Sequence, residues 1–376
     1  MTGKRLGVGI VGANWAARGH LPGWRMLPGG VDVRGIATRR AKTARAAADR
    51  LGLPRAYAGF AEMLADPDVD IVSLGGPPPA RVGMTLAALA AGKHVYTCIP
   101  FAVTVEQADA MAARQRDAGL AGAVDAYFRW TPGLSAMAAM IDAGELGELY
   151  AVNIDLDMAQ FVMPQSDYPY LWTGKAENGT GVFENSCAHL LHLVREMFGP
   201  VSELVADAAI VKKVWTLETG EDIVPEVPDT ANVIGRLANG ALFGIRAGRA
   251  VPSGEGFTLT AYGAKARLTA RSPAYPLDGT VRLALGRLAP VTCVDEIAVP
   301  VADRFFEVPG GLPAAQATAP VAVSLGRQFA AMLAAIDNEG ECAPSFSRAA
   351  EVQRLVSALA RSARERRWIG AGEWMQ

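Results

Sequence analysis

The sequence predicts two domains: an α/β domain built on a doubly wound parallel sheet, and a following α+β domain with a large, mainly antiparallel open sheet. The chain has 376 residues, which is more than one typical hydrophobic core accommodates. Before residue 128, short apolar stretches alternate with helical ones, as in successive strand–helix–strand units. Between residues 200 and 300, strand-like segments dominate instead. We therefore expect one domain at residues 1–127 and the other at residues 128–376.

The first predicted strand is Leu6–Val11, and a glycine turn and a helix follow it. A helix after such a turn presents backbone N–H groups and the positive end of its dipole to an anion such as phosphate. The pattern Gly12-x-Asn14-x-x-Ala17 matches the dinucleotide fingerprint, with Asn14 in place of the middle glycine. Asn tolerates a left-handed backbone better than most residues, so we expect the turn to persist. An ordinary strand–turn–helix unit remains the alternative.

Further strands are expected at residues 31–37, 69–74, 94–96 and 121–126, with helices between them. In a parallel α/β sheet, the loops at the carboxyl ends of the strands surround the ligand. These loops therefore supply the candidate cofactor-binding residues. The set comprises Gly12, Ala13, Asn14, Trp15, Ala16, Thr38, Arg39, Arg40, Gly76, Pro77, Arg81, Cys98, Ile99, Pro100 and Arg129.

Thr38, Arg39 and Arg40 follow the second strand, where dinucleotide sites distinguish NAD from NADP. NAD-selective sites place Asp or Glu there to bind the ribose 2′-hydroxyl, but the first acid after this strand is Asp49. A guanidinium binds a phosphate through two parallel hydrogen bonds. The tip therefore predicts NADP as the cofactor, with NAD as the alternative. A solvated basic turn is the other interpretation.

The composition excludes several classes of function. The formal net charge is −2 and no long basic run occurs, so nothing supports binding to nucleic acid or to an anionic membrane surface. No apolar stretch is long enough to span a membrane. Four cysteines lie far apart without a Cys-x-x-Cys pair, which favours free thiols and a cytoplasmic location. They are Cys98, Cys187, Cys293 and Cys342.

The second domain combines helices with a sheet. A strand is expected at residues 150–159, and an irregular loop follows at residues 160–181. Asn239-Gly240 lies between two apolar stretches and predicts a hairpin. The expected helices span residues 132–143, 182–198, 321–336 and 348–364.

Several motifs occur in order along nearly the whole chain. They are Gly12–Ala17, Asp70–Val72 with Pro77–Pro79, Ala91–Val95, Arg129-Trp130-x-Pro132, Gly144-x-x-Gly147, Tyr262-Gly263 and Ser357–Arg367. In these motifs the chain resembles the glucose–fructose oxidoreductase, inositol dehydrogenase and MocA (Gfo/Idh/MocA) family of NAD(P)-dependent dehydrogenases. The resemblance implies a Rossmann domain and a second domain whose open sheet mediates assembly. We expect a homodimer or homotetramer, because an apolar sheet face does not stay exposed.

The sequence departs from this family at three functional positions. The resemblance implies a Glu-Lys-Pro tripeptide whose Lys lies near nicotinamide and substrate, and here the tripeptide is Cys98-Ile99-Pro100. Arg81 replaces a family His after the proline-rich loop. A family helix carries Asp, then His four residues later, then Asp three residues beyond. The corresponding residues of this chain are Asn185, His189 and His192.

His189 is the candidate acid–base residue, because imidazole titrates near working pH and the resemblance places a catalytic His there. Asn185 shares its helical face and would hydrogen-bond a substrate hydroxyl. A buried, structurally satisfied His is the alternative. Lys175, Tyr168 or Tyr170 could replace the missing Lys as a proton donor, or could be surface residues.

No metal site is predicted. A site built from His189, His192 and either Cys187 or Glu196 lacks a fourth ligand, and Cys187 points elsewhere on the helix. Cys98 could lie near the nicotinamide, or could be a buried, inert thiol.

Two classes of function remain open. The first is an NADP-preferring oxidoreductase that transfers a hydride between nicotinamide and a hydroxyl or carbonyl carbon of a sugar, polyol or related small molecule. The second is a nucleotide-binding protein without dehydrogenase activity that has a regulatory or partner-binding role. A lyase or hydrolase in which bound cofactor cycles lies between them. The missing Lys and Asp favour the second class, whereas the pocket loops and the retained His favour the first.

Overall fold

The computed structural model describes residues 5–165, 171–288, 294–337, 342 and 344–375. The chain forms two compact units, one of residues 1–130 with 306–351 and one of residues 131–305 with 352–376. The sequence analysis placed residues 306–351 in the second domain, and here they pack with the first. The reason lies in the core, where the Phe329 ring stacks on the Trp24 ring with centroids 3.8 Å apart.

The first unit is built on a five-stranded parallel sheet in the order β2-β1-β3-β4-β5. Central strand β1 is apolar and buried from Gly7 to Val11, as a strand covered on both faces should be. The strand order reverses between β1 and β3, which is where parallel α/β sheets open a crevice for a ligand. The strands are β1 (Leu6–Val11), β2 (Val31–Ala37), β3 (Ile71–Leu74), β4 (His94–Thr97) and β5 (Gly122–Val124).

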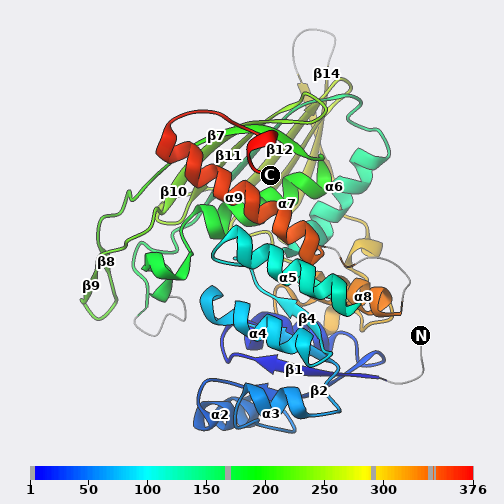
Figure 1. Ribbon diagram of the computed structural model, residues 1–376. Coiled ribbons are helices and arrows are strands. Elements are labelled where there is room, and N and C mark those ends of the chain that lie inside the picture. Colours follow the sequence, from blue (N-terminus) through cyan, green and yellow to red (C-terminus); the bar gives the residue numbers. More distant parts are fainter. Residues whose placement is uncertain (1–4, 166–170, 289–293, 338–341, 343, 376) are drawn as a thin grey trace. The chain divides into compact units, whose positions relative to one another are not determined.

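Helices connect and cover these strands (Figure 1). Helix α4 packs against β3, β4 and α5, while α1 packs against β2 and α8. Thr104 caps α5 by accepting a hydrogen bond from Gln107, and Gly119 ends that helix with a left-handed backbone. The helical elements are η1 (Ala16–His20), α1 (Leu21–Arg25), α2 (Ala41–Leu51), α3 (Phe60–Ala65), α4 (Pro78–Ala90), α5 (Val105–Ala118), η2 (Tyr127–Trp130) and α8 (Ala322–Ile336).

The second unit contains a nine-stranded sheet in the order β15-β14-β13-β12-β6-β11-β10-β7-β16. Strands β6 and β11 run parallel and every other neighbouring pair is antiparallel, which confirms the predicted sheet. The predicted hairpin at Asn239-Gly240 joins β10 to β11, with Gly240 at φ +91°. The strands are β6 (Leu149–Asp157), β7 (Val201–Ala209), β10 (Thr230–Leu237), β11 (Leu242–Gly248), β12 (Gly256–Gly263), β13 (Arg267–Ser272), β14 (Arg282–Leu288), β15 (Val294–Val299) and β16 (Ile369–Gly370).

Helices lie on one face of this sheet (Figure 1). Helix α6 packs on β13 and β14, η5 packs on β11, and Ser362 of α9 accepts a hydrogen bond from the backbone N–H of Ala206 on β7. The helix predicted at residues 182–198 is two elements, because a π-helical turn precedes the α-helix. The remaining elements are α6 (Pro132–Asp142), η3 (Leu171–Gly174), η4 (Ala176–Asn178), η5 (Phe183–Cys187), α7 (Ala188–Met197), β8 (Trp215–Thr216), β9 (Asp222–Ile223), η6 (Asp303–Phe306), η7 (Ala314–Gln316), α9 (Phe346–Glu365) and η8 (Ala371–Glu373).

The opposite face of this sheet carries apolar side chains. Leu242 on β11 and Tyr262 on β12 both pair with Ala151 of the strand between them, so all three residues share one face. Leu242 is 46% exposed and Tyr262 is 38% exposed. Ile234 on β10 pairs with Gly244 on the same face and is 56% exposed. Exposed apolar side chains grouped on one sheet face are typical of a contact with another protein chain, and the charged residues Arg236 and Arg246 share this face.

We expect Leu242→Asp to lower the molar mass of the protein in solution, because the substitution places a charge on the sheet face through which the chain would self-associate. Light scattering at micromolar concentration should give a dimer or tetramer for the unmodified chain and a smaller species for the variant. Val224→Asp is the matched control, since Val224 is exposed but lies outside this sheet. A monomeric mass for the unmodified protein would contradict the expectation.

Candidate functional site

The glycine turn after β1 forms as predicted. Gly12 has φ +102°, which favours glycine, and the Asn14 carbonyl accepts hydrogen bonds from Ala17 N (3.0 Å) and Arg18 N (2.8 Å). Asn14 does not use its tolerance of a left-handed backbone, because Arg366 is the one non-glycine residue with positive φ among the described residues, and the turn persists without it. A Cβ placed on Gly75 would lie 2.9 Å from the Ala16 Cβ, so the turn fits closely against the next loop.

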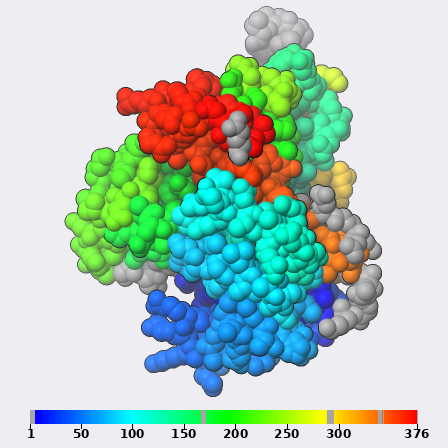
Figure 2. Space-filling view, viewed as in Figure 1, coloured from blue at the N-terminus to red at the C-terminus, as the bar shows by residue number. Residues whose placement is uncertain are grey.

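The predicted cation-rich tip of β2 is exposed. Arg39 and Arg40 lie at the surface, and the Thr38 hydroxyl donates a hydrogen bond to the Arg40 carbonyl. A hollow of about 350 Å³ adjoins the start of α2, and its charged lining residues are Lys42, Arg45 and Glu62, of which Glu62 is paired with Arg55 at 2.7 Å. In Figure 2, the blue part of the surface, which includes α2, has side chains that project into solvent. This edge can therefore receive an anionic group.

Arg81 is 1% exposed, and its guanidinium joins two loops at the carboxyl edge of the sheet. Nε donates to the Gly76 carbonyl (2.8 Å), and Nη1 donates to the Cys98 carbonyl (2.6 Å) and the Thr97 hydroxyl (2.9 Å). Nη2 donates to the Pro100 carbonyl. The structure thus shows Arg81 shaping the loops that hold the candidate residues Gly76, Cys98 and Pro100.

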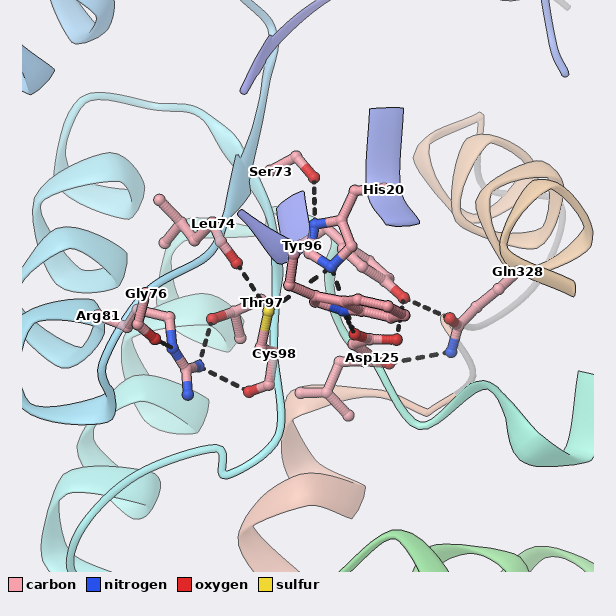
Figure 3. Close-up of polar contacts among 12 residues, drawn as sticks. His20, Ser73, Leu74, Gly76, Arg81, Tyr96, Thr97, Cys98, Asp125 and Gln328 are labelled. Atoms are coloured by element: carbon pink, nitrogen blue, oxygen red, sulfur yellow. Dashed lines mark hydrogen bonds and ion pairs between the residues drawn. The ribbon is translucent and has the colours of Figure 1, made fainter. Parts of the chain in front are cut away.

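A buried polar cluster that the sequence analysis did not identify joins the end of η1 to β3 and to the residues that follow β4 and β5 (Figure 3). Its centre is His20, whose Nε2 lies 3.3 Å from Asp125 Oδ2 and 3.6 Å from Cys98 Sγ. His20 Nδ1 contacts the Ser73 hydroxyl at 3.0 Å, and the Cys98 thiol donates to the Leu74 carbonyl at 3.2 Å. The one feature of the sequence that could have indicated this cluster is His20, which follows Gly12 by eight residues.

Aromatic and amide groups complete this cluster. The Trp24 indole donates to Ser73 Oγ at 3.1 Å, and the Trp15 indole donates to Asp125 Oδ2. The Tyr96 hydroxyl lies 3.5 Å from Asp125 Oδ1 and donates to Gln328, whose amide donates to the Val124 carbonyl at 2.9 Å. Burial raises the pKa of Tyr96 well above its usual value, so its hydroxyl stays protonated.

Burial alone would lower the pKa of His20, but its neighbours reverse the effect. Electrostatic interaction with Cys98 and hydrogen bonds to Asp125 and Cys98 favour the protonated ring and raise the pKa of His20 to about 9. At neutral pH the ring is therefore an imidazolium that donates from both nitrogens. Ligand atoms of His20, Cys98 and Asp125 lie within 4.8 Å of one another, close enough for one cation, and the side chains are already paired among themselves.

The second unit holds the catalytic candidates. Asn185 lies in the π-helical turn η5 and His189 in the first turn of α7, and both side chains are half-buried. His192 is buried, and its Nδ1 lies 3.9 Å from Glu196. Lys175 is exposed and pairs with Glu226 at 2.8 Å, and that hydrogen bond raises its pKa, so Lys175 is a poor proton donor near neutral pH. Tyr168 and Tyr170 lie outside the described residues.

A second functional candidate that sequence reasoning missed is Arg249, which is 2% exposed and lies just after β11. Its Nη1 donates to the Thr180 carbonyl at 2.7 Å, and its guanidinium lies over the Phe161 ring, 4.4 Å from the centroid. Burial raises the pKa of Glu184, while the nearby Arg249 charge opposes that rise. Arg249 therefore fixes both ends of the predicted irregular loop before η5.

Two family models match the chain. The model of an oxidoreductase family with an NAD-binding Rossmann fold matches residues 6–125, and that of the GFO/IDH/MocA C-terminal domain matches residues 134–269. D-apiose dehydrogenase of Paraburkholderia graminis is 29% identical over 222 residues, which are 59% of this chain and 56% of the relative. The chain thus matches little more than half the length of that relative.

Solved structures share the fold over almost the whole chain. A levoglucosan dehydrogenase in complex with NADH and L-sorbose superposes with a TM-score of 0.86 at 20% identity, covering 98% of this chain and 99% of that one. A super-repressor mutant of Gal80p from Saccharomyces cerevisiae superposes with a TM-score of 0.83 at 15% identity, covering 99% of both chains. At these identities the likeness shows the fold alone.

The raised pKa of His20 predicts that the protein loses stability in alkali. The contribution of this imidazolium is fully present below about pH 6.5, the unfolded value, and is lost as pH rises through the folded value of about 9. A shift of this size is worth on the order of 3 kcal/mol. Urea unfolding between pH 6 and pH 10 should therefore show a smaller alkaline loss for His20→Gln than for the unmodified protein.

His94→Gln is the control for this measurement. Burial lowers the pKa of His94 below its usual value of 6.5, so His94 is largely neutral in both the folded and the unfolded chain above about pH 8, and its replacement should leave the alkaline slope unchanged. The same slope in all three proteins would show that His20 does not titrate in this range.

Proposed function

The chain belongs to the Gfo/Idh/MocA family of oxidoreductases, and from this premise we propose that it transfers a hydride between a nicotinamide cofactor and a carbon of a sugar, polyol or related small molecule. The observation on which the proposal rests is the Gly12 turn at the carboxyl end of a buried parallel strand, at the switch point of the sheet. Relatives named as dehydrogenases of D-apiose and levoglucosan support a sugar-like substrate.

The described residues fit a dinucleotide. Gly12 has a positive φ and no side chain, so the turn leaves room for a ligand. No side-chain hydrogen bond caps the helical segment that starts after Trp15. The N–H groups of residues 13–16 can therefore bind a pyrophosphate. When bound, the nicotinamide ring of the cofactor accepts or donates the hydride.

We propose NADP as the preferred cofactor. Exposed Arg39 and Arg40 follow β2, and the adjoining hollow at α2 adds Lys42 and Arg45 to the same segment. A 2′-phosphate carries about two negative charges, so cations at this tip favour it over a 2′-hydroxyl. NAD remains the alternative, and the affinity ratio of the two cofactors decides between them.

The proton that accompanies the hydride needs a titratable group. Ile99 has none, and the amide of Asn185 does not titrate near neutral pH. We assign the step to His189, which is half-buried on α7 and could take a proton from a substrate hydroxyl or return it to a carbonyl oxygen. Asn185, in the preceding π-helical turn, would donate a hydrogen bond to the same oxygen.

A nucleotide-binding protein without dehydrogenase activity is the second candidate function. It is favoured by the absence of a titratable side chain at Ile99 and by the neutral Asn185. A panel of sugars and polyols, assayed by NADPH absorbance, separates the two functions. Binding of cofactor without turnover of any substrate would favour the second, and turnover without net change in NADPH would indicate a cycling lyase or hydrolase.

Arg39→Ala should lower the ratio of NADPH affinity to NADH affinity, since the variant loses a guanidinium that would bind the 2′-phosphate. We expect the unmodified chain to bind NADPH more tightly than NADH in fluorescence titrations. In the variant, NADPH affinity should fall about tenfold or more while NADH affinity stays within twofold. Arg50→Ala, at the exposed far end of α2, should change neither value. Equal or better NADH affinity in the unmodified chain would refute the preference.

His189→Asn should lower kcat by at least about 10²-fold, because a positioned general acid–base contributes roughly 10²- to 10⁴-fold. Cofactor affinity should stay within a few-fold, since the substitution removes proton transfer and not a cofactor contact. His192→Asn, which alters a buried residue paired with Glu196, should reduce kcat less. A near-normal kcat in His189→Asn would show that another side chain transfers the proton.

A further inference from the structure

Trp15 links the glycine turn to the opposite edge of the sheet. Its backbone follows β1, while its indole N–H donates to the carboxylate of Asp125, directly after β5. In the strand order, β3 and β4 lie between these two strands. The indole therefore links the turn to the end of β5, three strands along the sheet from β1.

The Asp125 carboxylate that accepts this hydrogen bond also contacts a buried histidine. Asp125 is 3% exposed, and the same Oδ2 atom lies 3.3 Å from Nε2 of the fully buried His20. His20 belongs to the helical segment that continues from the turn, and its other nitrogen contacts Ser73 on β3. Trp15, Asp125 and His20 thus form one connected set of side chains, which we name the Trp15 tether.

Packing restricts the indole further. A Cβ on Gly19 would lie 2.9 Å from the ring, and the ring centroid lies 6.2 Å from that of Tyr127 and 6.3 Å from that of His20. The ring cannot rotate away without breaking its hydrogen bond to a charged acceptor, which is the stronger class of hydrogen bond. The turn is consequently held in one conformation before any ligand arrives.

We propose that Asp125 is a positioning residue for nucleotide binding, which acts through the Trp15 indole and the His20 ring to hold the turn in its binding conformation. The inference rests on the proposed binding of a dinucleotide at this turn. A turn that is ordered in advance loses less conformational entropy when a pyrophosphate binds, so the tether raises affinity without touching the ligand.

The His20 charge contributes a second effect. The charged or titratable groups that face its ring are Asp125, Cys98 and Tyr96, and the uncharged groups are Ser73, Trp15 and Phe329. With His20 protonated, its charge offsets that of Asp125. When His20 loses its proton, the carboxylate is uncompensated and repels an anionic dinucleotide. Affinity should then fall as pH rises through about 9.

Trp15→Phe tests the tether, because phenylalanine keeps an aromatic ring and lacks the N–H donor. Trp24→Phe is the matched control, since it removes the indole N–H that donates to Ser73 in the same cluster but lies on α1, outside the turn. We expect Trp15→Phe to weaken NADPH binding at least about tenfold, the effect of losing one hydrogen bond to a charged group. Trp24→Phe should stay within twofold.

Hydrogen exchange of the free protein gives a readout that needs no ligand. Amides of residues 12–18 should exchange faster in Trp15→Phe than in the unmodified chain and should be unchanged in Trp24→Phe. Adenosine 2′-monophosphate, which lacks the pyrophosphate, should bind both variants alike. Asp125→Asn should remove the alkaline fall in affinity, because this variant has no carboxylate that could become uncompensated, whereas a merely structural Asp125 would lower affinity by one factor at every pH.

The outcomes separate this inference from the function on which it rests. If the unmodified chain binds no dinucleotide, the proposed cofactor is wrong, and the exchange of residues 12–18 alone decides whether the tether orders the turn. If NADPH binds but Trp15→Phe and Trp24→Phe change affinity and exchange equally, the positioning role is refuted while the proposed function stands.

Discussion

The contact between the His20 imidazole and the Asp125 carboxylate is the interaction on which the candidate cofactor site depends. Both side chains are buried, and an unpaired charge there would cost several kcal/mol. Pairing removes that cost and also places a hydrogen-bond acceptor where the Trp15 indole can reach it. One buried pair thus stabilises the core and orders a turn at the surface, and the loss of either member would affect both.

Two buried arginines hold irregular segments of the chain in place. Arg81 in the first unit and Arg249 in the second are each at most 2% exposed, and each donates hydrogen bonds to backbone carbonyl oxygens of irregular segments. Loops cannot satisfy their own carbonyl groups as helices and sheets do. A guanidinium has five donors in a planar array, so one side chain can fix several loop carbonyls at once.

Local patterns in the sequence were enough to predict the strands of the first unit, the Gly12 turn and the Asn239-Gly240 hairpin. Each depends on neighbouring residues alone, through burial periodicity or a positive φ. The π-helical turn at residues 183–187 has no such signature, and it changed the predicted single helix into two elements. The placement of residues 306–351 with the first unit depends on a ring stack between Phe329 and Trp24, which no local pattern reveals.

The candidate site was predictable only in part for the same reason. The turn residues and the exposed cations after β2 follow from their position beside strands, and the structure places them where they were expected. His20 and Asp125 are separated by 105 residues, so no spacing rule pairs them. Arg81 could be read as a cofactor ligand from its loop, whereas the structure shows its donors bound to carbonyl groups and a hydroxyl.

The segment around Ile99 shows how charge and proton transfer can be separated. The resemblance implies a lysine at this position, and a lysine supplies both a positive charge and a transferable proton. Here the single Arg81 guanidinium donates to the carbonyls of Cys98 and Pro100, the two residues that flank Ile99. A guanidinium does not give up its proton in a protein, because its pKa exceeds about 12. Arg81 therefore brings a fixed charge to this segment and no transferable proton, so the proton of the proposed hydride transfer has to come from a different kind of side chain, such as an imidazole.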